Sequence, residues 1–205
     1  MRKRLLIIGA SGHGKVAADI ADKMSKWESI GFLDDDESIM ECGGVEVLGR
    51  ISDIHKYIKD ADFFVAVGNN PNRKKIQEKL EALGASIATL IHPSVVLGAD
   101  VDIGSGTAAM AGAVINSSST IGKGCIINTN TSLDHDNMLG DYVHISPGVN
   151  IAGSVKVGQG TWVGIGASVV NNIEICEGCV VGAGAVVTKS LLEKGTYVGV
   201  PARRV

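Results

Sequence analysis

A histidine between two carboxylates is the part of this sequence best suited to chemistry. In the stretch SLDHDNMLGDYVHISPG, His135 stands between Asp134 and Asp136, and His144 follows nine residues later. A neutral imidazole accepts a proton near pH 7, and a neighbouring carboxylate fixes its tautomer and stabilises the imidazolium. The spacing predicts that His135 is a general base, with either aspartate as its partner. Metal binding by the two histidines is not indicated, because they lack a third ligand.

Four cysteines raise the question of a metal or a disulfide: Cys42, Cys125, Cys176 and Cys179. The spacing Cys176-Glu-Gly-Cys179 occurs in zinc sites, but structural zinc takes four ligands and no second pair is present. We therefore expect small buried thiols and no metal cofactor.

The glycine-rich segment GASGHGK provides a second candidate site. Gly9, Gly12 and Gly14 follow the apolar run LLII and precede the helix-like VAADIADKM. Their pattern is G-x-x-G-x-G, which differs from the dinucleotide fingerprint. A strand, a glycine turn and a helix in this order open a βαβ unit, and the free N–H groups at the start of the helix favour a phosphate.

Polar residues follow two further predicted strands. Asp34 and Asp35 come after SIGFL, and Gly68-Asn69-Asn70 comes after DFFVAV. With a fourth strand near SIATLI and a helix over PNRKKIQEKLEALG, they predict a parallel sheet of about four strands. Because open α/β sheets bind ligands at the carboxyl ends of their strands, we predict a mononucleotide-type ligand such as a nucleotide sugar. The alternative is a set of tight turns with capping aspartates.

The rest of the chain repeats with a period of six. A period of six is typical of a parallel β-helix in which three hexads form one coil and the repeated apolar residue points into the prism. We predict a Rossmann-like domain over residues 1–88 and a β-helix with a C-terminal tail over residues 89–205. The repeated residues are Ile91, Leu97, Ile103, Ala109, Ile115, Ile121, Ile127, Leu133, Leu139, Ile145, Ile151, Val157, Val163, Val169, Ile175, Val181 and Val187.

The repeat also places the histidines. Residues eighteen apart lie above one another in adjacent coils, so His135 points outward between Ser117 and Gly153. Small neighbours on both sides would leave the imidazole in an open slot. His144 also points outward, half a coil away, so the two histidines are expected to meet only across an interface between subunits.

Composition excludes several classes of function. The formal net charge of -3 does not favour a nucleic-acid surface. No run approaches the ~18 apolar residues of a membrane span, and the N-terminus does not resemble a signal peptide. We expect a cytoplasmic protein. Aromatic residues are only 4% of the chain, so the core must consist mainly of aliphatic residues.

Several segments carry a resemblance to a known family. GASGHGKV, FLDDD, FFVAVGNNPNRKKI, INTNTSLDHD and VGVPARRV occur in the order seen in the sialic-acid O-acetyltransferase-like group of hexapeptide-repeat sugar acyltransferases. Within that group the chain is most similar to the UDP-4-amino-sugar N-acetyltransferases, over essentially its full length. The resemblance implies a left-handed β-helix, acetyl-CoA as co-substrate, and a homotrimer whose acyl-donor sites lie between neighbouring prisms.

The resemblance also implies roles for individual residues. His135 matches the general base, and Asp136 replaces a glutamate that increases the basicity of that histidine. Positions expected to contact acetyl-CoA are His144, Gly153, Ile165 and Ala183, the last in place of a glycine. Positions expected to contact the nucleotide sugar are Ser11, Gly12, His13, Asp34, Asp35 and Gly68.

The sequence thus predicts an N-acetyltransferase that acetylates the 4-amino group of a UDP-linked sugar. Alternatives are an O-acetyltransferase of the sialic-acid type, an enzyme for a GDP-linked amino sugar, and a non-catalytic nucleotide-sugar-binding scaffold.

Overall fold

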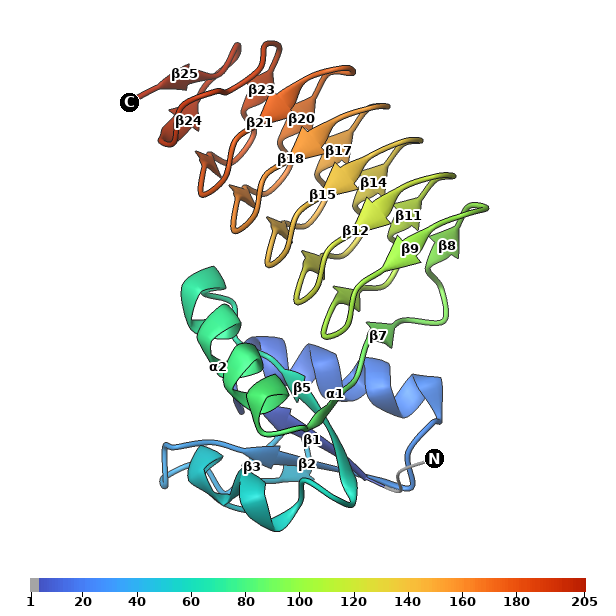
Figure 1. Ribbon diagram of the computed structural model, residues 1–205, viewed down its shortest axis with the longest axis vertical. Helices are drawn as coiled ribbons and strands as arrows, with labels where there is room; N and C mark the ends of the chain where they lie inside the picture. Colours follow the sequence, from blue (N-terminus) through green and yellow to red (C-terminus); the bar gives the residue numbers. More distant parts are fainter. Residues whose placement is uncertain (1–3) are drawn as a thin grey trace. The chain divides into compact units, whose positions relative to one another are not determined.

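The protein is described by a computed structural model that covers residues 4–205. The chain divides into two compact units, Met1–Pro93 and Ser94–Val205 (Figure 1). Among the described residues, no helix has both the length and the apolar character needed to cross a bilayer.

A four-stranded parallel sheet lies at the centre of the first unit, in the order β2-β1-β5-β6. Its predicted strands and two helices are confirmed. A short hairpin and a 3-10 helix, which the sequence did not indicate, connect β2 to β5. The elements are β1 (Arg4–Ile8), α1 (Gly12–Met24), β2 (Ser29–Leu33), β3 (Glu41–Cys42), β4 (Val45–Glu46), η1 (Ile51–Lys56), β5 (Ala61–Val65), α2 (Asn70–Ala82), β6 (Ser86–Ile87) and β7 (Leu90–Ile91).

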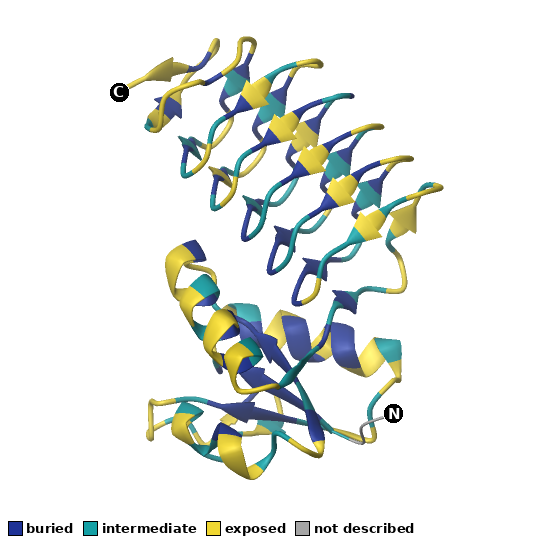
Figure 2. Cartoon of the chain, viewed as in Figure 1, coloured by how far each residue is buried: buried dark blue, intermediate teal, exposed yellow. Residues whose placement is uncertain are grey.

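The central strand β1 is buried on both faces, because it pairs with β2 and β5 and helices pack on the sheet. Leu5, Leu6, Ile7 and Ile8 are all fully buried. This double burial explains why LLII is continuously apolar instead of alternating. Figure 2 shows the same sheet as the most deeply buried part of the first unit.

The second unit is a parallel β-helix, as predicted, and Figure 1 shows its coils stacked one upon another. Its strands form three ladders. One contains β8 (Val96–Leu97), β11 (Val114–Ile115), β14 (Ser132–Leu133), β17 (Asn150–Ile151), β20 (Ser168–Val169) and β23 (Val186–Val187). The next contains β9 (Asp102–Ile103), β12 (Thr120–Ile121), β15 (Met138–Leu139), β18 (Lys156–Val157) and β21 (Glu174–Ile175). The last contains β10 (Ala108–Ala109), β13 (Ile126–Ile127), β16 (His144–Ile145), β19 (Trp162–Val163), β22 (Val180–Val181), β24 (Thr196–Val198) and β25 (Arg203–Arg204).

The register follows the predicted spacing of eighteen residues. Leu133 pairs with Ile115 in the coil before it and with Ile151 in the coil after it. The repeated apolar residues from Ala109 to Val187 are buried. At the start of the repeat, Ile91 and Ile103 are half-buried and Leu97 is 42% exposed. The first coil has a neighbouring coil on one side only, so its end of the prism stays open.

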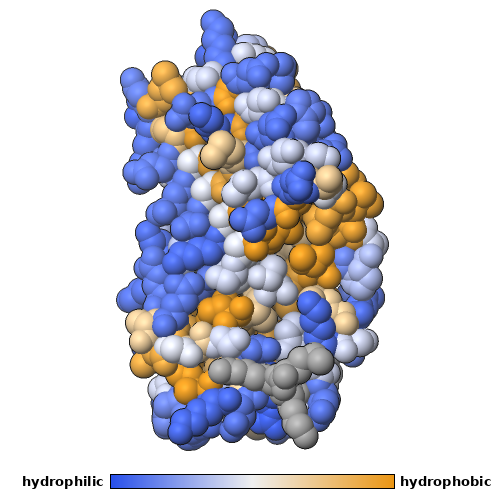
Figure 3. Space-filling view, turned by 45° about the vertical axis from the view of Figure 1, so that its right-hand side comes forward, coloured by the Kyte–Doolittle hydropathy of each residue, from blue (hydrophilic) through white to orange (hydrophobic). Residues whose placement is uncertain are grey.

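The surface of the second unit carries several exposed large hydrophobic side chains, among them Met138, Trp162 and Ile165. Figure 3 shows that hydrophobic and hydrophilic residues occupy separate areas on one face of the molecule.

All four cysteines are free. Cys125 and Cys179 lie inside the prism, and Cys176 at a turn is half-buried, with its Sγ 3.4 Å from that of Cys179. Across residues 4–205 no group of three or more His, Cys, Asp or Glu side chains is arranged to hold a metal ion.

Candidate active site

The turn between β14 and β15 presents His135 on the outside of the prism, with its side chain 58% exposed. Its backbone is tied to both neighbouring coils. The N–H of Asp136 donates to the carbonyl of Ser117 at 3.0 Å, and the N–H of Ser154 donates to the carbonyl of His135 at 2.9 Å. Asp136 adopts a left-handed φ of 58°, which aspartate tolerates better than most residues.

Asp136 is the carboxylate that contacts the imidazole. Its Oδ2 lies 2.7 Å from Nδ1 of His135, so Nδ1–H donates to the carboxylate and Nε2 is left to accept a proton. This hydrogen bond and, next, the charge of Asp134 raise the pKa of His135. Although Asp136 is one methylene shorter than glutamate, it therefore reaches the ring.

Asp134 contacts the backbone instead of the ring. Its Oδ1 accepts hydrogen bonds from the N–H of His135 at 2.9 Å and from Nδ2 of Asn116 at 3.1 Å. The backbone bond and then the bond from Asn116 lower the pKa of Asp134. The sequence left the choice between the two aspartates open, and the geometry assigns the ring contact to Asp136.

Gly153, one coil above, lies directly against the imidazole. A Cβ at this position would lie 2.6 Å from Cε1 and 2.7 Å from Nε2 of His135. Such distances are shorter than van der Waals contact, so any side chain here would displace the ring. The predicted open slot exists, and the residue assigned to the coenzyme channel is also the one that makes room for His135.

His144 lies on the strand β16, and the turn that carries His135 joins strands of the two other ladders. The structure therefore does not bring the two histidines together. The ring of His144 stacks on Trp162 of the next coil, with centroids 5.7 Å apart and planes inclined by 8°. The indole N–H of Trp162 donates to Oγ of Ser146 at 2.8 Å. Trp162 was not among the residues predicted from the sequence, although its spacing of eighteen residues from His144 marks it as a neighbour in the next coil.

Ile165 and Ala183 occupy equivalent positions in adjacent coils and are both exposed. The N–H of Gly184 donates to the carbonyl of Ile165 at 2.8 Å. A Cβ on Gly164 would lie 2.8 Å from the backbone nitrogen of Ala183. These two predicted coenzyme contacts thus lie together at the corner that follows β19 and β22.

In the first unit, two of the three motif glycines are required by the fold. Gly9 has a φ of +105°, and a Cβ on Gly14 would lie 2.2 Å from the carbonyl oxygen of Gly9. Gly9 makes the turn that precedes α1, and the helix begins at Gly12, earlier than the predicted segment VAADIADKM. A Cβ on Gly12 would meet nothing within 4 Å. Gly12 and Ser11 are exposed at the start of the helix, where Ser11 makes no side-chain cap.

The two predicted aspartates both hold backbone N–H groups. Asp34 accepts from the N–H of Ala10 at 2.7 Å, which links the glycine turn to the end of β2. Asp35 accepts from the N–H of Ile51 at 3.0 Å, at the start of η1. The alternative of capping aspartates is therefore observed, and any contact with a ligand would be an additional role.

His13 is half-buried in the first turn of α1, and its Nε2 atom is buried. Its Nε2 has no hydrogen-bond partner. Its ring lies edge-on to that of Phe64, with the two ring centroids 6.4 Å apart. Burial, followed by the positive charge of Arg73, lowers the pKa of His13 to about 4. Arg73 is fully buried and donates to the carbonyls of Val67 and Gly68 at 2.9 and 3.1 Å. No sequence signal marked it, because it lies in the charged segment NRKK.

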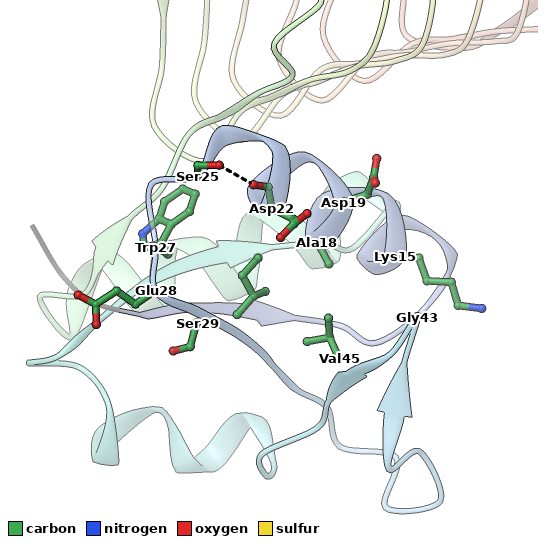
Figure 4. Close-up of a pocket in the computed structure, with 11 residues that line it drawn as sticks. Lys15, Ala18, Asp19, Asp22, Ser25, Trp27, Glu28, Ser29, Gly43 and Val45 are labelled. Atoms are coloured by element: carbon green, nitrogen blue, oxygen red, sulfur yellow. Dashed lines mark hydrogen bonds between the residues drawn. The ribbon is translucent and has the colours of Figure 1, made fainter.

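Two cavities of the first unit differ in their relation to the predicted site. One of about 500 Å³ runs along α1 and β2 and is lined by Asp19, Asp22 and Trp27 among others (Figure 4). It includes none of the predicted nucleotide-sugar contacts. Another of about 420 Å³ includes Asp35 and Lys75 and lies at the carboxyl ends of the strands. The second cavity fits the expected position of a nucleotide, because parallel sheets bind ligands at that edge.

Comparisons with known proteins match both units. Residues 4–80 match the family model for the PglD N-terminal domain, and residues 154–189 match the bacterial transferase hexapeptide model of six repeats. The solved acetyltransferase domain of PglB from Neisseria gonorrhoeae FA1090, in complex with acetyl coenzyme A, is 35% identical, covers 100% of both chains and has a TM-score of 0.97.

Two further relatives carry nucleotide-sugar names. PerB from Caulobacter crescentus, solved in complex with CoA and GDP-perosamine, is 35% identical over 98% of this chain and 96% of its own, with a TM-score of 0.90. A UDP-N-acetylbacillosamine N-acetyltransferase from Bacillus subtilis (strain 168) is 40% identical over 112 residues, 53% of this chain and 52% of that protein. The match spans about half the length of that curated relative.

Proposed function

The chain belongs to the sialic-acid O-acetyltransferase-like family of hexapeptide-repeat sugar acyltransferases, and we propose that it is an acetyl-CoA-dependent N-acetyltransferase of a nucleotide-linked amino sugar. The observation that carries the proposal is the exposed His135–Asp136 pair in the slot above Gly153. An imidazole with one nitrogen held by a carboxylate and the other open to the outside is arranged to take a proton from an incoming nucleophile.

The proposed reaction is a direct acetyl transfer. The sugar amine attacks the thioester carbonyl, and Nε2 of His135 takes the proton that the amine loses. A C–N bond forms, the C–S bond breaks, and the imidazolium returns its proton to the departing sulfur of CoA. Asp136 keeps Nδ1 protonated and stabilises the imidazolium. A positioned base of this kind contributes roughly 10²–10⁴-fold to the rate.

The proposal gives the two regions separate tasks. The region 1–88 binds the nucleotide sugar through Ser11, Gly12, His13, Asp34, Asp35 and Gly68. Gly12 supports this assignment, because it is exposed and the fold itself gives no reason for a glycine there. The region 89–205 binds acetyl-CoA through His144, Gly153, Ile165 and Ala183, and it carries the base.

UDP is the proposed carrier and the 4-amino group the proposed acceptor. The resemblance to UDP-4-amino-sugar N-acetyltransferases supports both, as does the 40% identity to the Bacillus subtilis relative. GDP is the second candidate, favoured by the PerB complex with GDP-perosamine. The active form is proposed to be a cytoplasmic homotrimer, because His135 lies in a turn between two ladders and His144 lies on the third, so that the two need a neighbouring subunit to meet. The exposed Met138, Trp162 and Ile165 support a subunit contact on the second unit.

A thiol-release assay with acetyl-CoA tests the proposal. The acceptors are UDP-, GDP- and CMP-linked 4-amino sugars and the matching sugars with a 4-hydroxyl group. We expect CoA release with the amino sugars, fastest with the UDP carrier. Release with the hydroxy sugars alone would identify an O-acetyltransferase. Acceptors that raise the melting temperature without any CoA release would identify a nucleotide-sugar-binding scaffold.

A further inference from the structure

We propose that Asn137 is a positioning residue for His135, and that its buried carboxamide fixes the orientation of the peptide between Asp134 and His135. The inference rests on the proposed role of His135 as general base. Asn137 lies in the turn that presents His135, but on the inside of the prism, and its side chain is fully buried.

The carboxamide of Asn137 makes two hydrogen bonds, and both are to backbone groups. Its Nδ2 donates to the carbonyl of Asp134 at 2.7 Å. Its Oδ1 accepts from the N–H of Val155, one coil above, at 3.0 Å. A polar group inside an aliphatic prism is costly unless it is hydrogen-bonded, so the carboxamide remains only where these bonds hold it.

A second side chain acts on the same carbonyl. Oγ of Ser119, one coil below, donates to the carbonyl of Asp134 at 3.0 Å and accepts from the N–H of Asn137 at 3.2 Å. At the other end of the same peptide, the N–H of His135 donates outward to Oδ1 of Asp134 at 2.9 Å. The peptide is thus held from inside and from outside, and its orientation sets the direction in which the imidazole leaves the backbone.

Other coils show that the β-helix itself does not need a carboxamide here. Val155 occupies the position equivalent to Asn137 in the next coil, and it is a buried aliphatic residue. Polar residues elsewhere in the prism make a different contact. Thr107, for example, donates to the carbonyl of Gly122 at 2.8 Å and accepts from the N–H of Cys125 at 2.9 Å, so it links one coil to the next. Asn137 instead donates three residues back, into its own turn.

The consequence concerns the contact between His135 and Asp136. Those two side chains are more than half exposed, so packing does little to hold them. The turn beneath them must supply the alignment that keeps Nδ1 within 2.7 Å of the carboxylate. Loss of the bond from Asn137 leaves only Ser119 and Asp134 to hold the peptide, so it rotates more readily and the imidazole spends less time paired with Asp136.

The variant Asn137→Ser tests this inference. A serine at this position keeps a hydroxyl that can accept from Val155, as Ser119 does one coil below, but its side chain is too short to replace the bond to Asp134. We expect kcat to fall about tenfold while KM for acetyl-CoA changes by less than about twofold. In NMR titrations, the imidazole signal of His135, assigned with His135→Ala, should titrate at lower pH than in the wild type.

Thr107→Val is the matched control, because it removes two buried hydrogen bonds from the prism without touching the turn of His135. It should lower the melting temperature as Asn137→Ser does, but leave kcat and the titration of His135 as in the wild type. Equal effects of the two variants on kcat and on the titration would reduce Asn137 to a structural residue and overturn the inference.

Ser119→Ala provides a second variant if Asn137→Ser does not fold. It removes the other donor to the carbonyl of Asp134, and a smaller downward shift of the His135 titration is expected. No shift in this variant would also overturn the inference. The titration does not depend on turnover, so the role of Asn137 and the role of His135 as base can fail separately. Wild-type kcat in His135→Ala would refute His135 as the base, whatever its titration in the Asn137→Ser variant shows.

Discussion

The two units each carry a histidine near the residues predicted to act, and their surroundings are opposite. His13 is half-buried in the first unit, its Nε2 is buried without a hydrogen-bond partner, and its pKa is lowered to about 4. His135 is exposed on the second unit and paired with Asp136, and its pKa is raised. Burial disfavours an imidazolium, whereas a carboxylate stabilises it. His13 is therefore set to stay neutral, and His135 to receive a proton.

The difference indicates that the two histidines are suited to different roles. An imidazole whose pKa is lowered in this way stays neutral over the physiological range of pH. An exposed imidazole beside a carboxylate is suited to pick up a proton and to release it. Of the two histidines, His135 is therefore the one whose surroundings suit proton transfer.

Removal of His135 should produce the largest effect. We expect His135→Ala to lower kcat by roughly 10²–10⁴-fold, because the amine then loses its base. Affinity for the nucleotide sugar should stay near that of the wild type. His55→Ala, at an exposed histidine of η1, is the control. Steady-state kinetics of both variants test this prediction. Wild-type turnover in His135→Ala would show that another group is the base.

The depressed pKa of His13 should make stability depend on pH. The unfolded chain takes up a proton on this residue near pH 6.5, whereas the folded chain resists it down to about pH 4. The contribution is fully present above pH 6.5 and is lost as the pH falls toward 4. Between pH 7 and pH 5, we expect a loss of about 2 kcal/mol in the free energy of unfolding.

Urea unfolding of wild type and His13→Gln at both pH values measures this loss. Because glutamine does not titrate, the variant should lose about 2 kcal/mol less than the wild type in the free energy of unfolding between pH 7 and pH 5. The same pH dependence in both proteins would show that His13 is not the group responsible. It would contradict the lowered pKa of His13, and with it the contrast between the two histidines.

Replacement of Asp136 or Asp134 should lower the pKa of His135 by different amounts. Asp136→Asn removes the largest cause of the raised pKa of His135, so the acid limb of the kcat–pH profile should move to lower pH. Because a weaker base also removes the proton less readily, we expect kcat at its plateau to fall by about tenfold. Asp134→Asn removes a charge near the imidazole but keeps an amide oxygen that can accept from the N–H of His135, so it should shift the limb less. A larger shift with Asp134→Asn would contradict the contact assigned to Asp136.

The sequence was most informative in the second unit, because its geometry repeats. The period of six placed Leu133 between Ile115 and Ile151 and put Gly153 next to His135, as observed. In the first unit, the order of strands and helices was predictable, but the buried position of Arg73 was not. Its surroundings depend on the loop after β5, which no local pattern describes.

The coil register, the parallel sheet and the outward position of His135 could be predicted from the sequence, because each depends on a spacing along the chain. The choice between Asp134 and Asp136 and the place of Asn137 beneath the turn became visible in three dimensions. Asp134 and Asp136 each lie one residue from His135, so spacing cannot distinguish them, while their side chains leave the backbone in different directions. Hydrogen bonds respond to those directions, and a one-dimensional pattern does not contain them.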